Sequence, residues 1–297
     1  MFKGSMVALV TPMQADGTIH KKSLHDLVEW HIDAKTSAII VNGTTGESPT
    51  LSKEEQEEMI TSVVKQAKGR IPIIAGTGTN ATHTTVAHTQ FAKEAGVDAC
   101  LLIAPYYNRP TQNGVYEHFK TVAEKVALPI ILYNHPGRTG CDILPETIQR
   151  LADLPNIIGV KEATGKTERC VEVLKRCGTA FAVYSGDDAT AYDFMLHGAH
   201  GVISVAANLI PHQMRDLCEA ALSGNKALAN QLNTQFMGLF NKLCLETNPT
   251  PVKWAACEMG LIPSGIRLPL LPLDTKFHSE LRTALQEAGL AHTTKEV

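Results

Sequence analysis

The sequence predicts an α/β fold, a (β/α)8 TIM barrel with a C-terminal helical appendage. Eight short apolar runs recur about every 20–35 residues, without the period-2 alternation of half-exposed strands, as expected for parallel strands covered on both faces. Helical patterns fill the gaps between the runs. The chain has 297 residues, and one α/β barrel commonly takes about 250. An open, doubly wound sheet is the alternative fold.

The predicted strands and their helices follow one another in strict alternation. A capping box, Ser52-x-x-Glu55, begins the helix after the second strand, and Pro145 suits the first turn of the helix after the fifth. Gly69 and Gly96 lie just past predicted helix ends, where a left-handed cap is favoured. The eight strands are expected at Met6–Val10, Ala38–Asn42, Pro72–Ala75, Ala99–Ala104, Pro129–Tyr133, Ile157–Lys161, Ala182–Ser185 and Gly201–Val205.

The chain beyond residue 222 contains no further strand pattern. We therefore predict a catalytic barrel over residues 1–222 and a helical region over residues 223–297. Helices are expected at about 225–245, 251–260 and 275–289, separated by proline-rich breaks.

Composition narrows the possible partners and the compartment. The formal net charge is −3, and no apolar run approaches the roughly 18 residues of a membrane helix, so we expect neither nucleic acid nor membrane as a partner. The seven scattered cysteines form no C-x-x-C pair, which favours reduced thiols in a cytoplasmic protein. The histidines show no ligand spacing, so we expect no metal, and no cofactor.

Lys161 is the strongest candidate for chemistry, because it ends the sixth apolar run, Ile157–Val160. Active sites of barrels lie at the carboxyl ends of the strands. A lysine in an apolar barrel mouth loses hydration, which favours the neutral amine that attacks ketones and forms an imine. By position alone, a lysine that reaches out to solvent is the commoner outcome.

Other polar residues follow neighbouring strands and are expected at the same mouth. Tyr133 could move protons during imine formation, or be a tyrosine at the edge of the core. Thr44 and Thr45 could relay protons or hold a carboxylate, or serve only as turn residues. Arg138 could bind a substrate carboxylate with its planar fork, or form a surface ion pair. A glycine pattern at 76–81 matches a degenerate dinucleotide motif, but its place after the third strand argues against one.

Motifs spread over almost the whole chain resemble the dihydrodipicolinate synthase (4-hydroxy-tetrahydrodipicolinate synthase) family of pyruvate-dependent class I aldolases. They occur in order and with similar spacing, and the Arg-Thr-Gly at 138–140 is the most specific of them. The motifs are Gly43-Thr44-Thr45-Gly46-Glu47, Pro105-Tyr106-Tyr107, Tyr133-Asn134-x-Pro136-x-Arg138-Thr139-Gly140, Gly159-Val160-Lys161-Glu162, Ser185-Gly186-Asp187-Asp188 and Asn248-Pro249-x-Pro251-Val252-Lys253.

The resemblance implies an aldol-type condensation of pyruvate with L-aspartate 4-semialdehyde on the path to lysine and diaminopimelate. It implies that Lys161 forms the imine and that Thr44, Tyr107 and Tyr133 relay protons, with Tyr107 reaching in from a neighbouring subunit. It also implies a homotetramer built as a dimer of dimers. The residues implied in substrate binding are Thr45, Arg138, Gly186 and Ile203.

Two departures from the family pattern lead to expectations of their own. His135 stands where relatives often carry valine, and we expect altered packing and a local pH effect without lost catalysis. Lys53, Gln56 and Thr84 occupy positions that align with the histidines and glutamate of lysine-inhibited relatives. Because an added cation and fewer acceptors weaken the binding of a cation, we expect weak or absent inhibition by lysine.

Three other functions compete with this hypothesis. A sister lyase, such as N-acetylneuraminate lyase or a 2-keto-3-deoxy sugar acid aldolase, would use the same lysine and tyrosine, but these branches tend to lack Arg138. A barrel kept only for binding predicts a damaged site, whereas the expected catalytic residues are all present. The dinucleotide enzyme suggested by residues 76–81 is the third.

Overall fold

The computed structural model describes residues 1–290, so the last seven residues of the predicted C-terminal region lie outside the described part. Eight parallel strands form a closed barrel in sequential order, which confirms the predicted TIM barrel. The open sheet is wrong, because β1 pairs with β8. The strands are β1 (Gly4–Ala8), β2 (Ala38–Val41), β3 (Ile73–Gly76), β4 (Ala99–Ile103), β5 (Ile130–Asn134), β6 (Ile157–Glu162), β7 (Ala182–Ser185) and β8 (Gly201–Ser204).

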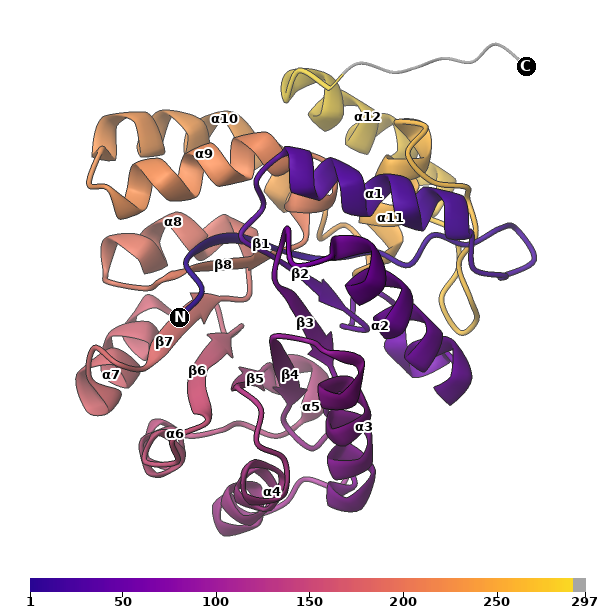
Figure 1. Ribbon diagram of the computed structural model, residues 1–297. Helices are drawn as coiled ribbons and strands as arrows, with labels where there is room; N and C mark the ends of the chain where they lie inside the picture. The colour runs from indigo at the N-terminus through magenta and orange to yellow at the C-terminus, as the bar shows by residue number, and fades with distance from the viewer. Residues whose placement is uncertain (291–297) are drawn as a thin grey trace.

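Helices surround the barrel; in the C-terminal region α10 packs against α8 and α9, and α12 packs against α10 and α11 (Figure 1). The capping box at Ser52 and Glu55 is formed, and Pro145 begins α6. Lys68 is the cap residue of α2, and Gly69, which follows it, is also left-handed at φ 73°, while Gly96 is the left-handed cap of α3. The helices are α1 (Lys21–Asp33), α2 (Lys53–Ala67), α3 (Thr82–Ala95), α4 (Gln112–Lys125), α5 (Pro136–Thr139), α6 (Pro145–Ala152), α7 (Thr167–Cys177), α8 (Asp188–Leu196), α9 (Pro211–Leu222), α10 (Lys226–Lys242), α11 (Thr250–Glu258) and α12 (His278–Glu287), with short 3-10 turns at Ser48–Thr50, Ala206–Asn208 and Thr275–Phe277.

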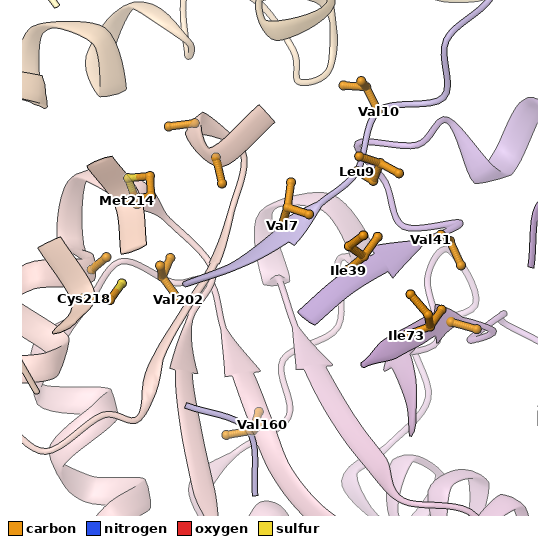
Figure 2. Close-up of a cluster of buried hydrophobic side chains, with 14 of the residues drawn as sticks. Val7, Leu9, Val10, Ile39, Val41, Ile73, Val160, Val202, Met214 and Cys218 are labelled. Carbon is orange, nitrogen blue, oxygen red and sulfur yellow. The ribbon is translucent and has the colours of Figure 1, made fainter. Parts of the chain in front are cut away.

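Each strand is buried on both faces, and its side chains alternate between two apolar clusters. One cluster fills the space between barrel and helices, and Figure 2 shows Val7, Ile39 and Val160 there with Met214 of α9. The other fills the barrel interior and includes Tyr133. Because Val160 points outward, the period of two directs the next residue of β6 into the barrel.

The glycine pattern at 76–81 has a packing role. A Cβ on Gly76 would lie 2.2 Å from the carbonyl oxygen of Asn42, and one on Gly78 would lie 2.4 Å from the backbone nitrogen of Ile103. Only glycine allows such a close approach of neighbouring backbones. The barrel geometry therefore accounts for both glycines, and the dinucleotide hypothesis loses its support.

The C-terminal region packs onto the same core as the barrel. Phe236 and Phe240 of α10 are buried in the cluster that covers the outside of the strands. Lys253 of α11 forms a buried ion pair with Glu47, in the loop after β2. The other carboxylate oxygen of Glu47 accepts a hydrogen bond of 3.0 Å from the backbone nitrogen of Arg267. These contacts attach the C-terminal region to the barrel mouth, while a domain boundary at residue 222 stays a prediction.

The buried pair gives a stability prediction. Replacing Glu47 by glutamine leaves the Lys253 ammonium buried without its counter-charge, which should lower the free energy of unfolding by about 3–5 kcal/mol. Glu47→Gln combined with Lys253→Met should recover part of this loss. The control is Glu58→Gln, which removes the exposed pair with Lys21 and should cost less than about 1 kcal/mol. Chemical denaturation measures all three, and equal losses for Glu47→Gln and Glu58→Gln would contradict the prediction.

Candidate active site

A cavity of about 400 Å³ lies at the carboxyl ends of the strands. Its walls come from the loops after the strands and from the segment between α10 and α11. A volume of this size suits a small-molecule substrate. Six of the eight predicted site residues line it: Thr44, Thr45, Tyr133, Arg138, Lys161 and Gly186.

Lys161 points into this cavity from β6 and is only 5% exposed. It pairs with Tyr133 in the β5–β6 register, and its Nζ atom lies 4.3 Å from the centroid of the Tyr133 ring. Burial lowers the pKa of Lys161 from 10.5 to about 8; Arg138 acts in the same direction, and the Asp188 carboxylate opposes it. This raises the fraction of neutral amine at pH 7 by about 300-fold. The amine is therefore poised as a nucleophile.

Gly186 provides the space that the Lys161 side chain occupies. A Cβ at Gly186 would lie 3.0 Å from Cε of Lys161 and 2.6 Å from Cβ of Ala163. Real Cβ contacts are almost never shorter than about 3 Å, because atoms at that distance repel each other. A side chain at position 186 would therefore collide with Ala163 and press against the lysine, so one of these residues must shift.

Tyr133 lies beside the lysine as a neutral phenol. Burial raises the pKa of Tyr133 to about 12, although the Arg138 cation and a hydrogen bond with the Thr44 side chain lower it. A phenol with this pKa keeps its proton at physiological pH and can donate it to an oxygen that develops negative charge. Tyr133 therefore contacts Thr44 through a side-chain hydrogen bond and Lys161 through its ring.

The C-terminal segment completes the cavity, which the sequence analysis did not foresee. The side-chain nitrogen of Asn248 donates to Oγ1 of Thr45 at 3.0 Å, and the backbone carbonyl oxygen of Asn248 accepts from the Arg138 guanidinium at 3.1 Å. Leu243 and Glu246 also line the cavity. The Asn-Pro-x-Pro-Val-Lys motif was the available signal, but no periodicity places a loop 90 residues downstream of Lys161 at the barrel mouth.

Asp188 is a second cavity residue that was not singled out. It is 7% exposed, and its Oδ2 accepts hydrogen bonds from the backbone nitrogens of Val205 at 3.0 Å and Ala206 at 2.8 Å. Burial raises the pKa of Asp188 to about 6. Asp188 is therefore mostly ionised at pH 7 and is the nearby anion that opposes the loss of charge at Lys161. The sequence feature that could have identified Asp188 is the Gly-Asp-Asp motif after the seventh strand.

The two remaining predicted residues do not line the cavity of this chain. The Ile203 side chain is fully buried in the cluster inside the barrel, so only its backbone could face a ligand. Tyr107 is 90% exposed and has a positive φ of 74°, with its backbone nitrogen donating to Thr139. A large aromatic side chain held outward on strained backbone is typical of a contact with another molecule.

Within residues 1–290, no group of three or more histidine, cysteine, aspartate or glutamate side chains is arranged to hold a metal ion. The same residues contain no helix that is both long and apolar enough to cross a bilayer. All seven cysteines are free thiols.

Comparison with known proteins gives a consistent match along the chain. A family model, "Dihydrodipicolinate synthetase family", matches residues 1–288. A Pseudomonas aeruginosa protein named 4-hydroxy-tetrahydrodipicolinate synthase is 56% identical over 290 residues, 98% of this chain and 99% of the relative. The Acinetobacter baumannii dihydrodipicolinate synthase, solved with pyruvate and described as chloride inhibited, is 50% identical with a TM-score of 0.97 over 98% of this chain and 100% of that one.

A third similar structure bears on assembly. It is described as the first monomeric dihydrodipicolinate synthase variant, and it is 39% identical with a TM-score of 0.95 over 98% of both chains. The fold is therefore also found in a protein described as a monomer.

The packing at Gly186 gives a prediction about activity. Gly186→Ala should reduce kcat by up to about 100-fold, because relief of the contacts with Ala163 and Lys161 moves the amine from its reacting position. Gly238→Ala on α10 is the control, since its Cβ would meet nothing closer than 3.8 Å. Steady-state kinetics together with a circular dichroism spectrum measures both. A folded Gly186→Ala protein with wild-type turnover would contradict this account.

Proposed function

This chain belongs to the dihydrodipicolinate synthetase family, and we propose that it condenses pyruvate with L-aspartate 4-semialdehyde to 4-hydroxy-tetrahydrodipicolinate. This reaction is the first committed step toward lysine and diaminopimelate. The observation that carries the proposal is the buried amine of Lys161, whose pKa is lowered to about 8 inside the cavity.

The chemistry begins when the neutral amine of Lys161 attacks C2 of pyruvate. The carbinolamine loses water as a proton reaches its hydroxyl group, which leaves a cationic imine. Loss of a proton from C3 gives an enamine, and C3 then bonds to the aldehyde carbon of the second substrate. The amino group of that substrate attacks C2, closes the ring and releases Lys161 as a free amine.

Neighbouring groups supply the proton transfers and the substrate contacts. Tyr133 keeps its proton at neutral pH and donates it to the departing hydroxyl, with Thr44 as the next member of the path. The loop of Thr44 and Thr45 offers hydroxyl and backbone donors for the pyruvate carboxylate. Arg138 lies at the exposed rim of the cavity, where its guanidinium binds the carboxylate of the second substrate. Gly186 and the backbone of Ile203 complete the pyruvate pocket.

Tyr107 belongs to this proton path only if a second copy of the chain brings it in. Its exposed ring and positive φ support a role at an interface between subunits. We infer a homotetramer, a dimer of dimers in which each tight pair exchanges this tyrosine. The free thiols of all seven cysteines support a cytoplasmic location.

Borohydride trapping tests the role of Lys161. Incubation with pyruvate and sodium borohydride should reduce the imine to a stable adduct, and peptide mass mapping should place it on Lys161. The Lys161→Ala protein should form no adduct and lose nearly all activity. Lys166→Ala, which removes an exposed lysine nearby, should trap as the wild type does. An adduct on the Lys161→Ala protein, or on another lysine of the wild type, would refute the proposal.

Complementation tests the shared tyrosine. Lys161→Ala and Tyr107→Phe chains should each be almost inactive alone. Co-expressed chains should form mixed dimers that regain activity, because a Tyr107→Phe chain keeps its lysine and receives Tyr107 from the Lys161→Ala chain. The control pairs the Tyr107→Phe chain with a chain that carries both Lys161→Ala and Tyr107→Phe. This mixed dimer should stay inactive. Purified mixed dimers without recovered activity would contradict exchange of the tyrosine.

A further inference from the structure

His135 lines the cavity between two residues with proposed roles, Tyr133 and Arg138. Its ring centroid lies 6.1 Å from that of Tyr133. The carbonyl oxygen of His135 accepts hydrogen bonds from the backbone nitrogens of Arg138 at 3.0 Å and Thr139 at 3.1 Å, which begin α5. These bonds fix the backbone from which the imidazole enters the cavity.

The imidazole of His135 has unused hydrogen-bonding capacity. Its Nδ1 is buried without a hydrogen-bond partner, and within residues 1–290 no other side chain bonds to Nε2 either. A Cβ on Gly137 would lie 3.7 Å from Nδ1, so this nitrogen faces its own chain. The ring lines the cavity, and Nε2 is the ring nitrogen left for a bound molecule to reach. Buried polar groups without partners are uncommon, and each calls for an explanation, such as a catalytic role or a bound water or ion.

The ring is uncharged at physiological pH. Burial, together with the cations of Arg138 and Lys161, lowers the pKa of His135 to about 4. A neutral imidazole offers one N–H donor and one acceptor. A donor beside the Arg138 guanidinium suits a carboxylate, because the two groups can bind its two oxygens without adding another cation to the cavity.

We propose that Nε2 of His135 donates a hydrogen bond to the carboxylate of the second, aldehyde substrate, next to Arg138. The inference rests on the proposed function. It makes His135 a specificity-determining residue: it favours aldehydes that carry a carboxylate and has no part in imine formation at Lys161. From the sequence we expect altered packing at position 135. The proposal assigns His135 a direct contact with substrate instead.

Three substitutions at position 135 test the proposal. His135→Val should raise KM for L-aspartate 4-semialdehyde about tenfold, the usual effect of losing a hydrogen bond to a charged group. The KM for pyruvate should stay within twofold of wild type. His135→Gln, whose amide nitrogen can occupy the position of Nε2, should recover most of the loss. His135→Asn reaches only the position of Nδ1 and should not recover it.

An analogue identifies the substrate group that is bound. Succinic semialdehyde keeps the carboxylate but lacks the amino group, and His135→Val should weaken its binding to the pyruvate-loaded enzyme by the same factor. An unchanged KM for the aldehyde, rescue by asparagine, a raised KM for pyruvate, or no effect on the analogue would each overturn the proposal. Normal trapping of pyruvate by borohydride in His135→Val separates failure of this contact from failure of the proposed function.

Discussion

The amine of Lys161 is held where water cannot solvate an ammonium ion well, and the chemistry of the cavity follows from that loss of hydration. Three features of the fold produce it. The alternation of side chains along β6 turns position 161 into the barrel. The closed sheet supplies apolar walls below the amine. The missing side chain at Gly186 leaves room for the extended lysine. If the Lys161 side chain could extend to the surface, its ammonium group would reach solvent and stay charged.

The charged groups around the cavity limit how far burial lowers the pKa of Lys161. Burial alone would push the pKa of Lys161 down further, while the ionised Asp188 opposes it. Arg138 acts with burial and at the same time favours the anionic form of Tyr133, whose pKa burial nevertheless raises to about 12. The result is a lysine with an appreciable neutral fraction beside a protonated phenol. These are the two protonation states that imine formation from a ketone requires.

The sequence was informative wherever local pattern and position decide structure. Apolar runs without alternation marked every strand, because both faces of a parallel barrel are covered, and the mouth residues followed from where those runs end. Strand limits moved by one or two residues, as at β1, which begins at Gly4 instead of Met6. Contacts between distant segments were not foreseeable. The ion pair of Glu47 with Lys253 and the bond from Asn248 to Thr45 span about 200 residues, and nothing in periodicity encodes them. The position of Tyr107 could not be predicted from pattern alone, for a different reason. Its side chain is exposed in a single chain, and its proposed role depends on contact with a second subunit.

The central claim is that burial lowers the pKa of Lys161 enough to give an appreciable fraction of neutral amine at pH 7, and a direct titration tests it. Protein labelled with 13C at the lysine Cε can be followed by NMR from pH 6 to 11, with the Lys161 signal assigned by its loss in Lys161→Met. The account predicts a midpoint near 8 for this lysine, well below the ordinary lysine value of 10.5. A midpoint for Lys161 that coincides with those of the exposed lysines would contradict the account.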